Sequence, residues 1–315
     1  MSANPKPAIL AVGGAHIDRR GTVAGAYVDG ASNPGTMREE VGGGAFNALR
    51  NACRLGAAGA ILSVRGGDLT GQLVAEAISG AGITDLSATF LDRTTPSYTA
   101  ILRADGELIC GFADMALYET AFEKQLRRHP FRNTLPGADA VLTDANLSQG
   151  ALERLAASVD QKPLFAIAIS PAKVVRLKPV LAALSVLFMN RNEARALTGA
   201  EAGAPNEQLA QKLAQAGLKR AVITSGSAPL LILEHGHVTT SAPIVSSNVR
   251  DVTGAGDALA GVTISRLIGG LDLAEAVRHG IAAASLTVES DNVVADFSRA
   301  DFERRLAEIQ QTTGA

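Results

Sequence analysis

The residues with the clearest chemical potential form one short segment, Asp251-Val-Thr-Gly-Ala-Gly-Asp257, which leads into a stretch with a single charged side chain, Ala258–Gly269. The low charge of that stretch predicts a buried helix. A carboxylate at the start of a buried helix costs desolvation energy unless it has a partner or a function. The position of Asp257 therefore requires an explanation.

The small residues before Asp257 supply one. Gly254 and Gly256 allow a tight turn that directs free backbone N–H groups, with that of Ala255, at one point, where the helix dipole adds partial positive charge. A carboxylate beside such an anion hole suits phosphoryl transfer to an alcohol, because it takes the hydroxyl proton while the hole stabilises the γ-phosphate oxygens. Each well-placed donor is worth about 3 to 4 kcal/mol by analogy with oxyanion holes. The segment predicts a kinase with Asp257 as its general base.

Three other interpretations of the segment are weaker. Asp257 could merely cap the helix while the glycines form a turn. A dinucleotide-binding loop requires Gly or Ala three residues after Gly256, where Leu259 stands, and it follows the first strand of a chain. The sequence also contains no G-x-x-x-x-G-K-[ST] phosphate loop.

The elements that must position this segment follow an α/β pattern. Apolar runs alternate with helical patterns, which predicts a mostly parallel sheet with helices on both faces. The predicted buried strands are Ile9–Val12, Val141–Thr143, Leu164–Ile169, Val186–Met189 and Ala221–Thr224. A helix that begins at Ala45 carries a polar face made of Asn47, Arg50, Asn51 and Arg54.

Two stretches, at about residues 19–41 and 86–115, break this alternation and predict a small β lid. In the second stretch, Ser97–Ala104 and Glu107–Phe112 flank Asp105-Gly106, a pair that favours a type I′ hairpin turn. The lid is expected to cover a site at the carboxyl edge of the sheet. The whole chain, residues 1–315, is expected to form one domain of this kind.

Composition narrows the class of partner. The chain carries 29 Lys and Arg against 31 Asp and Glu, so we expect neither nucleic acid nor an acidic membrane surface as a partner. Cys53 and Cys110 belong to no ligand cluster, which favours a reducing compartment. Met1–Pro7 lacks the pattern of a secretory signal, and the longest apolar run, Val180–Met189, is shorter than the ~20 residues of a membrane span. We therefore expect a cytoplasmic protein.

The segment Asp251–Asp257 resembles the C-terminal signature of the ribokinase-like (PfkB) carbohydrate and nucleoside kinases. Further similarities to motifs of this family lie at Gly42-Gly43-Gly44-Ala45-Phe46-Asn47, Gly67-Asp68 with Gly71, and Asn190-Arg-Asn-Glu193, so the resemblance extends over most of the chain. It implies a three-layer α/β/α ribokinase-like fold, ATP as the phosphate donor and Mg²⁺ as a cofactor. It leaves activation by a monovalent cation such as K⁺ open.

The same resemblance implies roles for individual residues. The residues implied at the nucleotide are Asn190, Glu193, Thr224, Gly226 and Thr253, with Glu193 organising Mg²⁺ through water. On the sugar side, the resemblance implies that Asp18, Gly43 and Asn47 hold hydroxyl groups so that another hydroxyl faces Asp257. A carboxylate after the first strand can accept two hydroxyl hydrogens, although an ordinary ion pair with Arg19 or Arg20 is the alternative for Asp18.

Three positions depart from the family pattern. Pro229 stands where the family's T-x-G-x-x-G stretch has its last glycine, and His16 replaces an asparagine two residues before Asp18. An aspartate that members often carry near Ile167 or Ala168 is absent. These departures leave the ribose or base contact of ATP, and the role of His16, open.

Short segments resemble the pseudouridine kinases within this family: Ser32-Asn33-Pro34-Gly35, Ala113-Asp114-Met115, Asp144-Ala-Asn146 and Ser241-Ala-Pro243. They imply that ATP phosphorylates the 5′-hydroxyl of pseudouridine. The base would then lie under the lid near Asn33, Tyr98 and Asp114, although polar side chains in such strands often simply face water.

Two rival functions stay open. The first is another kinase of the family that acts on ribose, adenosine or a sugar phosphate, and a sugar phosphate would need several cations, which Arg19, Arg20, Arg38 and Arg103 offer. The second is a nucleoside- or nucleotide-binding sensor without turnover, which would not need Asp257. The resemblance also implies a homodimer that forms through the lid.

Overall fold

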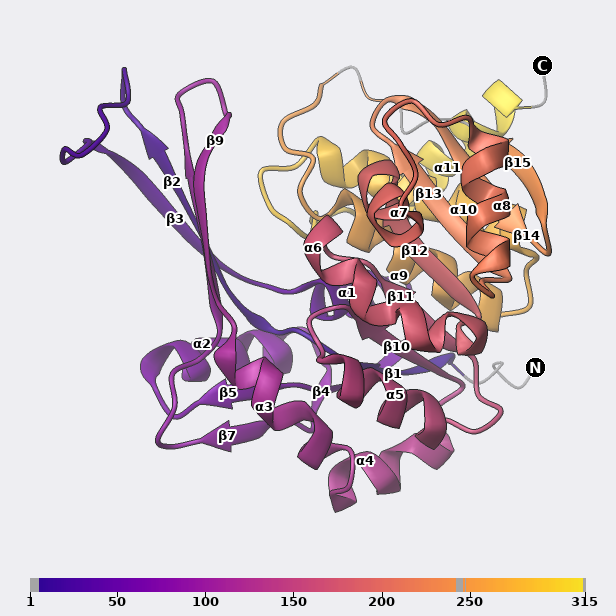
Figure 1. Ribbon diagram of the computed structural model, residues 1–315, viewed down its shortest axis with the longest axis horizontal. Helices are drawn as coiled ribbons and strands as arrows, with labels where there is room; N and C mark the ends of the chain where they lie inside the picture. Colours follow the sequence, from indigo (N-terminus) through magenta and orange to yellow (C-terminus); the bar gives the residue numbers. More distant parts are fainter. Residues whose placement is uncertain (1–5, 242–245, 247, 314–315) are drawn as a thin grey trace.

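The computed structural model describes residues 6–241, 246 and 248–313. Met1–Pro5 and the last two residues of the segment Ser241-Ala-Pro243 lie outside the described residues. Within the described part, the fold is a central sheet between two helical layers, with a second, smaller sheet that extends to one side (Figure 1).

The central sheet has nine strands among the described residues, in the order β15-β14-β13-β12-β11-β10-β1-β4-β6. In that order they span His237–Ser241, Ala228–Glu234, Arg220–Ser225, Val186–Asn190, Leu164–Ile167, Ala140–Asp144, Ala8–Val12, Ala58–Leu62 and Thr84–Asp85. Neighbours from β13 to β6 pair in parallel, whereas β14 and β15 add antiparallel strands at one edge. The predicted mostly parallel sheet is confirmed. Strand β11 ends earlier than predicted, and the backbone of Ile169 is left-handed.

Alternating side chains divide the core between the two faces of this sheet, as the two-residue period of a strand requires. Leu10 and Val12 of β1 belong to one apolar cluster, and Ile9 and Ala11 belong to the other. The first cluster packs under α3 (Ala116–Gln125), α4 (His129–Thr134), α5 (Gln149–Ser158), α6 (Pro171–Val174), α7 (Arg191–Thr198) and α8 (Asn206–Gln215). The second packs under α1 (Gly44–Arg54), α2 (Leu69–Gly80), α9 (Ala255–Ile268) and α10 (Leu273–Val288), with α11 (Arg299–Thr313) outside α9 and α10. The three-layer prediction is therefore confirmed.

The small sheet has the order β3-β2-β8-β9, with strands Gly35–Gly42, His16–Val23, Ser97–Leu102 and Leu108–Asp114. The predicted hairpin is present, but the type I′ turn is wrong. Gly106 has φ +89° while Asp105 is not among the residues with positive φ, and the Gly106 N–H donates to the Arg103 carbonyl, which is the geometry of a type I turn followed by a left-handed glycine.

The second predicted lid stretch does not lie wholly in the small sheet. Strand β7 (Ala88–Phe90) pairs in parallel with β5 (Val64–Gly66) in a separate two-stranded sheet beside α2. The part of residues 86–115 that extends the small sheet therefore begins at Ser97.

Two short 3₁₀ helices, η1 (Leu135–Gly137) and η2 (Val175–Ala183), complete the described elements. None of the described helices combines the length and the apolar composition that crossing a membrane requires.

Candidate active site

The turn into α9 is built from glycines for two different reasons. Gly254 is the N-cap of the helix with a left-handed backbone (φ +78°), and a Cβ there would lie 2.1 Å from the Val293 carbonyl oxygen, so both conformation and space require glycine. At Gly256 no atom would lie within 4 Å of a Cβ, so the first turn faces open space. No side chain caps this helix start. An anion at this helix start would meet the helix dipole and the N–H groups of the turn, of which that of Ala255 donates to the Val252 carbonyl at 3.4 Å. The anion hole of Gly254, Ala255 and Gly256 stays a prediction.

Asp257 lies in the first turn of α9, and its carboxylate is held from α1. The Asn47 amide Nδ2 donates to Asp257 Oδ2 at 2.9 Å, which leaves Oδ1 without that contact. Burial raises the pKa of Asp257 to about 7; the hydrogen bond from Asn47 and the charge of Arg50 oppose the rise, while Asp144 and Asp18 add to it. A carboxyl group with this pKa is suited to accept a proton near neutral pH.

Asp18 projects from β2, and the structure gives His16 a role beside it. His16 Nε2 lies 3.3 Å from Asp18 Oδ1, and His16 Nδ1 lies 3.2 Å from the Tyr118 hydroxyl. A Cβ at Gly42 would lie 2.1 Å from Asp18 Oδ2, so Gly42 makes room for the carboxylate. The alternative ion pairs of Asp18 with Arg19 or Arg20 are not formed, because those arginines contact Glu39 and Asp251 instead.

Gly43 is the N-cap of α1 and fits only glycine. Its φ is +114°, and a Cβ would lie 2.3 Å from the Gly14 carbonyl oxygen. The turn therefore brings the end of β3, the start of α1 and the β1–β2 connection together at one place.

The three residues predicted to lie near a base are placed differently from one another. Tyr98 of β8 stands opposite Asp18 in the parallel β2–β8 register and so shares its face of the small sheet. Asp114 alternates with Ala113, the partner of Tyr98, and therefore lies on the other face. The Asn33 amide is used inside its own loop, where it contacts the backbone of Val28 and Ala31. The structure brings only Tyr98 to the side of Asp18.

Four of the five predicted nucleotide residues lie at the carboxyl ends of β12 and β13: Asn190, Glu193, Thr224 and Gly226. Asn190 and Thr224 are partners in the parallel register, and Gly226 (φ +61°) forms the tight turn into β14. Asn190 and Glu193 form a capping box at the start of α7, in which Asn190 Oδ1 accepts from the Glu193 N–H at 2.9 Å and Glu193 Oε2 accepts from the Asn190 N–H at 2.7 Å. These two side chains therefore already have a structural function.

Thr253 is exposed, and its N–H donates to Asp251 Oδ1 at 2.9 Å. The other oxygen of Asp251 pairs with Arg20 of β2. This ion pair joins the small sheet to the loop that precedes the glycine turn.

A buried polar group that sequence analysis did not assign lies next to the site. Asp144, at the end of β10, accepts from the N–H groups of Gly14 and Ala45 at 2.9 and 3.0 Å. Asn146 Oδ1 accepts from Lys173 Nζ at 2.6 Å, and the Asn146 Nδ2 group is buried without a partner among the described residues. The matched segment Asp144-Ala-Asn146 after a buried strand was the available signal. Lys173, more distant in sequence, gave none.

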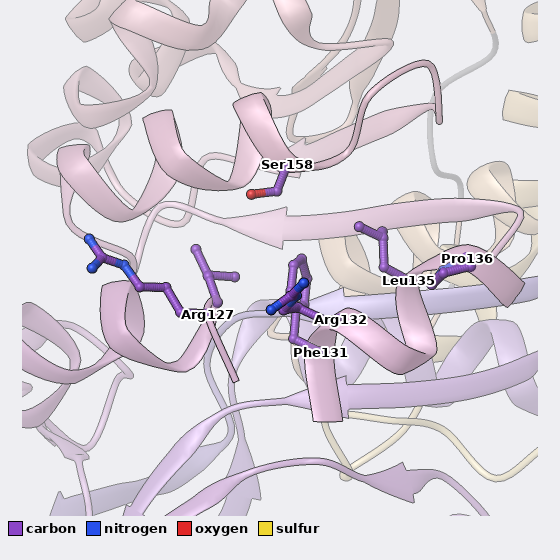
Figure 2. A pocket seen from close by; sticks show the side chains of 7 residues that line it. Arg127, Phe131, Arg132, Leu135, Pro136 and Ser158 are labelled. Carbon is purple, nitrogen blue, oxygen red and sulfur yellow. The ribbon is translucent and has the colours of Figure 1, made fainter. Parts of the chain in front are cut away.

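A groove elsewhere on the molecule is separate from these residues. It lies between α3, α4 and α5 and is lined by Leu126, Arg127, Phe131, Arg132, Leu135, Pro136 and Ser158 (Figure 2). It contains none of the predicted site residues, so it has no part in the chemistry argued from Asp257.

In the part of the chain that the structure describes, no three His, Cys, Asp or Glu side chains gather into a group that could hold a metal ion. A Mg²⁺ ion that keeps most of its waters and binds substrate phosphates needs only one or two carboxylates. Glu193, which is buried and whose pKa is raised by that burial, fits such an outer contact but not a direct cage.

Comparison with known proteins places this geometry in context. A model of the pfkB family of carbohydrate kinases matches residues 6–299. The chain is 30% identical over 294 residues to pseudouridine kinase from Escherichia coli K12, covering 91% of this chain and 93% of the relative. It is 25% identical over 292 residues to guanosine-inosine kinase from Exiguobacterium acetylicum, covering 90% and 94%.

Solved structures of carbohydrate kinases have the same fold. A carbohydrate kinase from Agrobacterium tumefaciens is 44% identical, with a TM-score of 0.83 over 96% of this chain and 98% of that chain. Ribokinase from Arabidopsis thaliana, solved with ribose and ATP, is 21% identical with a TM-score of 0.82 over 96% and 99%, which supports the fold.

Proposed function

The chain belongs to the pfkB family of carbohydrate kinases, and on that premise we propose that it transfers the γ-phosphate of ATP to the 5′-hydroxyl of pseudouridine, giving pseudouridine 5′-phosphate and ADP. The observation that carries the proposal is a carboxylate in the first turn of an uncapped helix, beside a glycine turn that opens to space. The similarity to a pseudouridine kinase over nearly the whole chain supports the choice of substrate.

The proposed chemistry uses the two oxygens of Asp257 differently. Oδ2 accepts the hydrogen bond from Asn47, so Oδ1 takes the proton of the 5′-hydroxyl. The hydroxyl oxygen forms a bond to the γ-phosphorus as the bond from that phosphorus to the β,γ-bridging oxygen breaks, and ADP leaves. The N–H groups at the start of α9 stabilise the charge on the transferred phosphoryl oxygens.

The sugar would lie between the small sheet and α1. Asp18, held by His16, is placed to accept ribose hydroxyl hydrogens, and the Gly43 turn lets a sugar approach the backbone. Tyr98 shares the face of Asp18 and is the predicted base contact that the fold favours. Asn33 and Asp114 would need a different loop or strand arrangement to reach the same ligand.

The nucleotide would lie beyond the glycine turn, along the ends of β12 and β13. Thr224 and Gly226 border that edge, and Thr253 is exposed on the loop before α9. When bound, Mg²⁺ supplies positive charge that neutralises the phosphates. Glu193 would contact it through water, and Asn190 would orient Glu193 through the capping box.

A sugar phosphate is the less favoured substrate because three of the four arginines considered for its phosphate are already engaged, whereas Arg38 of β3 forms no ion pair among the described residues. Arg19 pairs with Glu39, Arg20 with Asp251, and Arg103 with Glu107. A neutral nucleoside does not require free cations at the sugar.

The small sheet is also the proposed dimer contact. Met37 and Phe112 are 57% and 67% exposed, and the strand register places both on the face opposite Asp18. Large apolar side chains exposed on a sheet face favour contact with a second copy. Light scattering should show a dimer that Phe112→Lys dissociates.

The substrate assignment is tested by ADP release with ATP and Mg²⁺ across pseudouridine, uridine, adenosine, guanosine, ribose and fructose 6-phosphate. Pseudouridine should give a kcat/KM at least about tenfold above the others, because a site built to hydrogen-bond one base rejects analogues that leave its polar groups unpaired. A preference for a purine nucleoside or for ribose would retain the family chemistry and reject the substrate.

A further inference from the structure

Arg50 is a half-buried cation of α1 that the proposed chemistry does not use. It lies one helical turn after Asn47, on the same face of the helix. Its Nη2 group donates to Asn47 Oδ1 at 2.6 Å and to the Val41 carbonyl at 3.0 Å, and its guanidinium lies 4.5 Å from the centre of the Phe46 ring. Three contacts from different directions therefore fix the position of this side chain.

The contact with Arg50 decides which way the Asn47 amide points. A guanidinium only donates hydrogen bonds, so the atom of Asn47 that faces it must be the carbonyl oxygen. The NH₂ group of Asn47 then faces Asp257 Oδ2, where it donates at 2.9 Å. A flipped amide would place its oxygen against the carboxylate, and two acceptors would repel each other. Arg50, Asn47 and Asp257 thus form a directed chain of hydrogen bonds from α1 to α9.

We propose that Arg50 is a positioning residue, which fixes the Asn47 amide so that its NH₂ group holds the Asp257 carboxylate toward the acceptor hydroxyl. This inference rests on the proposed role of Asp257 and assigns a function to a side chain that does not touch substrate. It predicts that the effect of Arg50 is transmitted through Asn47.

Charged side chains from several elements lie near this series of hydrogen bonds. Asp257 is faced by Asp144 of β10, Asp18 of β2 and Arg50 itself; Arg50 is faced by Glu40 of β3, Asp18, Asp257 and Arg54. Burial lowers the pKa of Arg50 to about 10, so it stays a cation at neutral pH. Removing its charge takes away a cation that lowers the pKa of Asp257, while Asp144 and Asp18, which raise that pKa and also interact with Lys173, remain; this favours the protonated form of the base.

The test compares wild type with Arg50→Met, Arg50→Lys, Asn47→Ala and the double variant Asn47→Ala/Arg50→Met. For Arg50→Met we expect kcat to fall by at least about tenfold, an unchanged KM for ATP, and an acid limb of kcat displaced to higher pH. Arg50→Lys, which keeps the charge, should retain the wild-type acid limb while kcat recovers only in part. In the Asn47→Ala background, with kcat measured at a pH above the acid limb where Asp257 is ionised in every variant, the Arg50→Met change should alter kcat by less than about twofold, since its route through Asn47 is already removed.

Arg54→Met is the matched control. Arg54 is on the same helix and also lies over an aromatic ring, that of Phe297, but it pairs with Asp296 outside the site. It should leave kcat and the pH profile unchanged. If Arg50→Met fails to fold, the comparison of Arg50→Lys with Asn47→Ala/Arg50→Lys carries the same coupling test. Additive effects of the two sites, or a wild-type kcat and acid limb in Arg50→Met, would overturn the inference.

A parallel measurement on Asp257→Asn separates the positioning role of Arg50 from the proposed role of Asp257 as the base. An inactive Asp257→Asn with a normal Arg50→Met rejects only the positioning role. An active Asp257→Asn rejects the proposed chemistry itself.

Discussion

Gly261 of α9 lies directly against the backbone of Ala48 of α1: a Cβ on Gly261 would stand 1.9 Å from the Ala48 carbonyl oxygen. The two helices approach this closely one turn after Asp257 and one residue after Asn47. The distance between the carboxylate and its amide partner is therefore set by a glycine that touches neither.

Gly261→Ala should both destabilise the protein and impair catalysis. The added methyl group meets backbone, which cannot move aside as a side chain can, so we expect a loss of at least about 2 kcal/mol in the free energy of unfolding. The separation of α1 from α9 should also lower kcat. Denaturant unfolding and steady-state kinetics measure the two effects. Gly80→Ala is the control, because no atom lies within 4 Å of a Cβ there; a Gly261→Ala variant as stable and active as Gly80→Ala would contradict the close packing.

The pH dependence of kcat/KM should report the ionisation of Asp257. The pKa of this acid is raised to about 7 by burial, so the carboxylate base is present above pH 7 and is lost as the pH falls. We expect kcat/KM to fall about tenfold per pH unit below this value. A flat profile between about pH 5.5 and 8, measured with the same ionic strength throughout, would show that no such group governs the reaction.

Asp18→Asn should weaken nucleoside binding and leave ATP binding intact. The variant loses a charged acceptor of ribose hydroxyl hydrogens, an interaction worth about 1.5 to 3 kcal/mol. The KM for the nucleoside should therefore rise by about 10- to 100-fold, with the KM for ATP within about twofold of wild type. Equal effects on both substrates would argue that Asp18 has only a structural role beside His16.

Glu193→Gln separates the capping function of this residue from its proposed contact with Mg²⁺. Glutamine still offers an oxygen to the Asn190 N–H, so the unfolding temperature should stay near that of wild type. The loss of charge should raise the Mg²⁺ concentration for half-maximal activity by about threefold or more. Glu193→Ala, which lacks both functions, should also lower the unfolding temperature. A normal Mg²⁺ response in Glu193→Gln would confine Glu193 to the capping box.

The fold and the start of α9 could be predicted because their signals are local. Alternating buried strands and helices define the sheet, and the glycines before Asp257 stand next to it in sequence. The burial of the polar face of α1 could not be predicted in this way. Asn47 and Asn51 are buried there, because α9 packs against α1, and periodicity does not reveal what packs opposite.

The remaining site contacts were beyond prediction for a related reason. Lys173 and Asn146 meet across 27 positions of sequence, and Asp144 reaches the N–H groups of two distant turns. The face on which Asp114 lies depends on the exact strand register. The pair Asp105-Gly106 does not decide the turn type, because it suits both the predicted type I′ turn and the type I turn with a left-handed glycine that the hairpin adopts.

The most direct test of the account is the turnover of Asp257→Asn. Asparagine has nearly the same shape and can still accept the hydrogen bond from Asn47, so the fold and the affinity for ATP, measured by calorimetry, should be retained. Without the base, kcat for pseudouridine should fall by at least about 10²-fold. An Asp257→Asn enzyme with a kcat near that of wild type would contradict the role of this carboxylate.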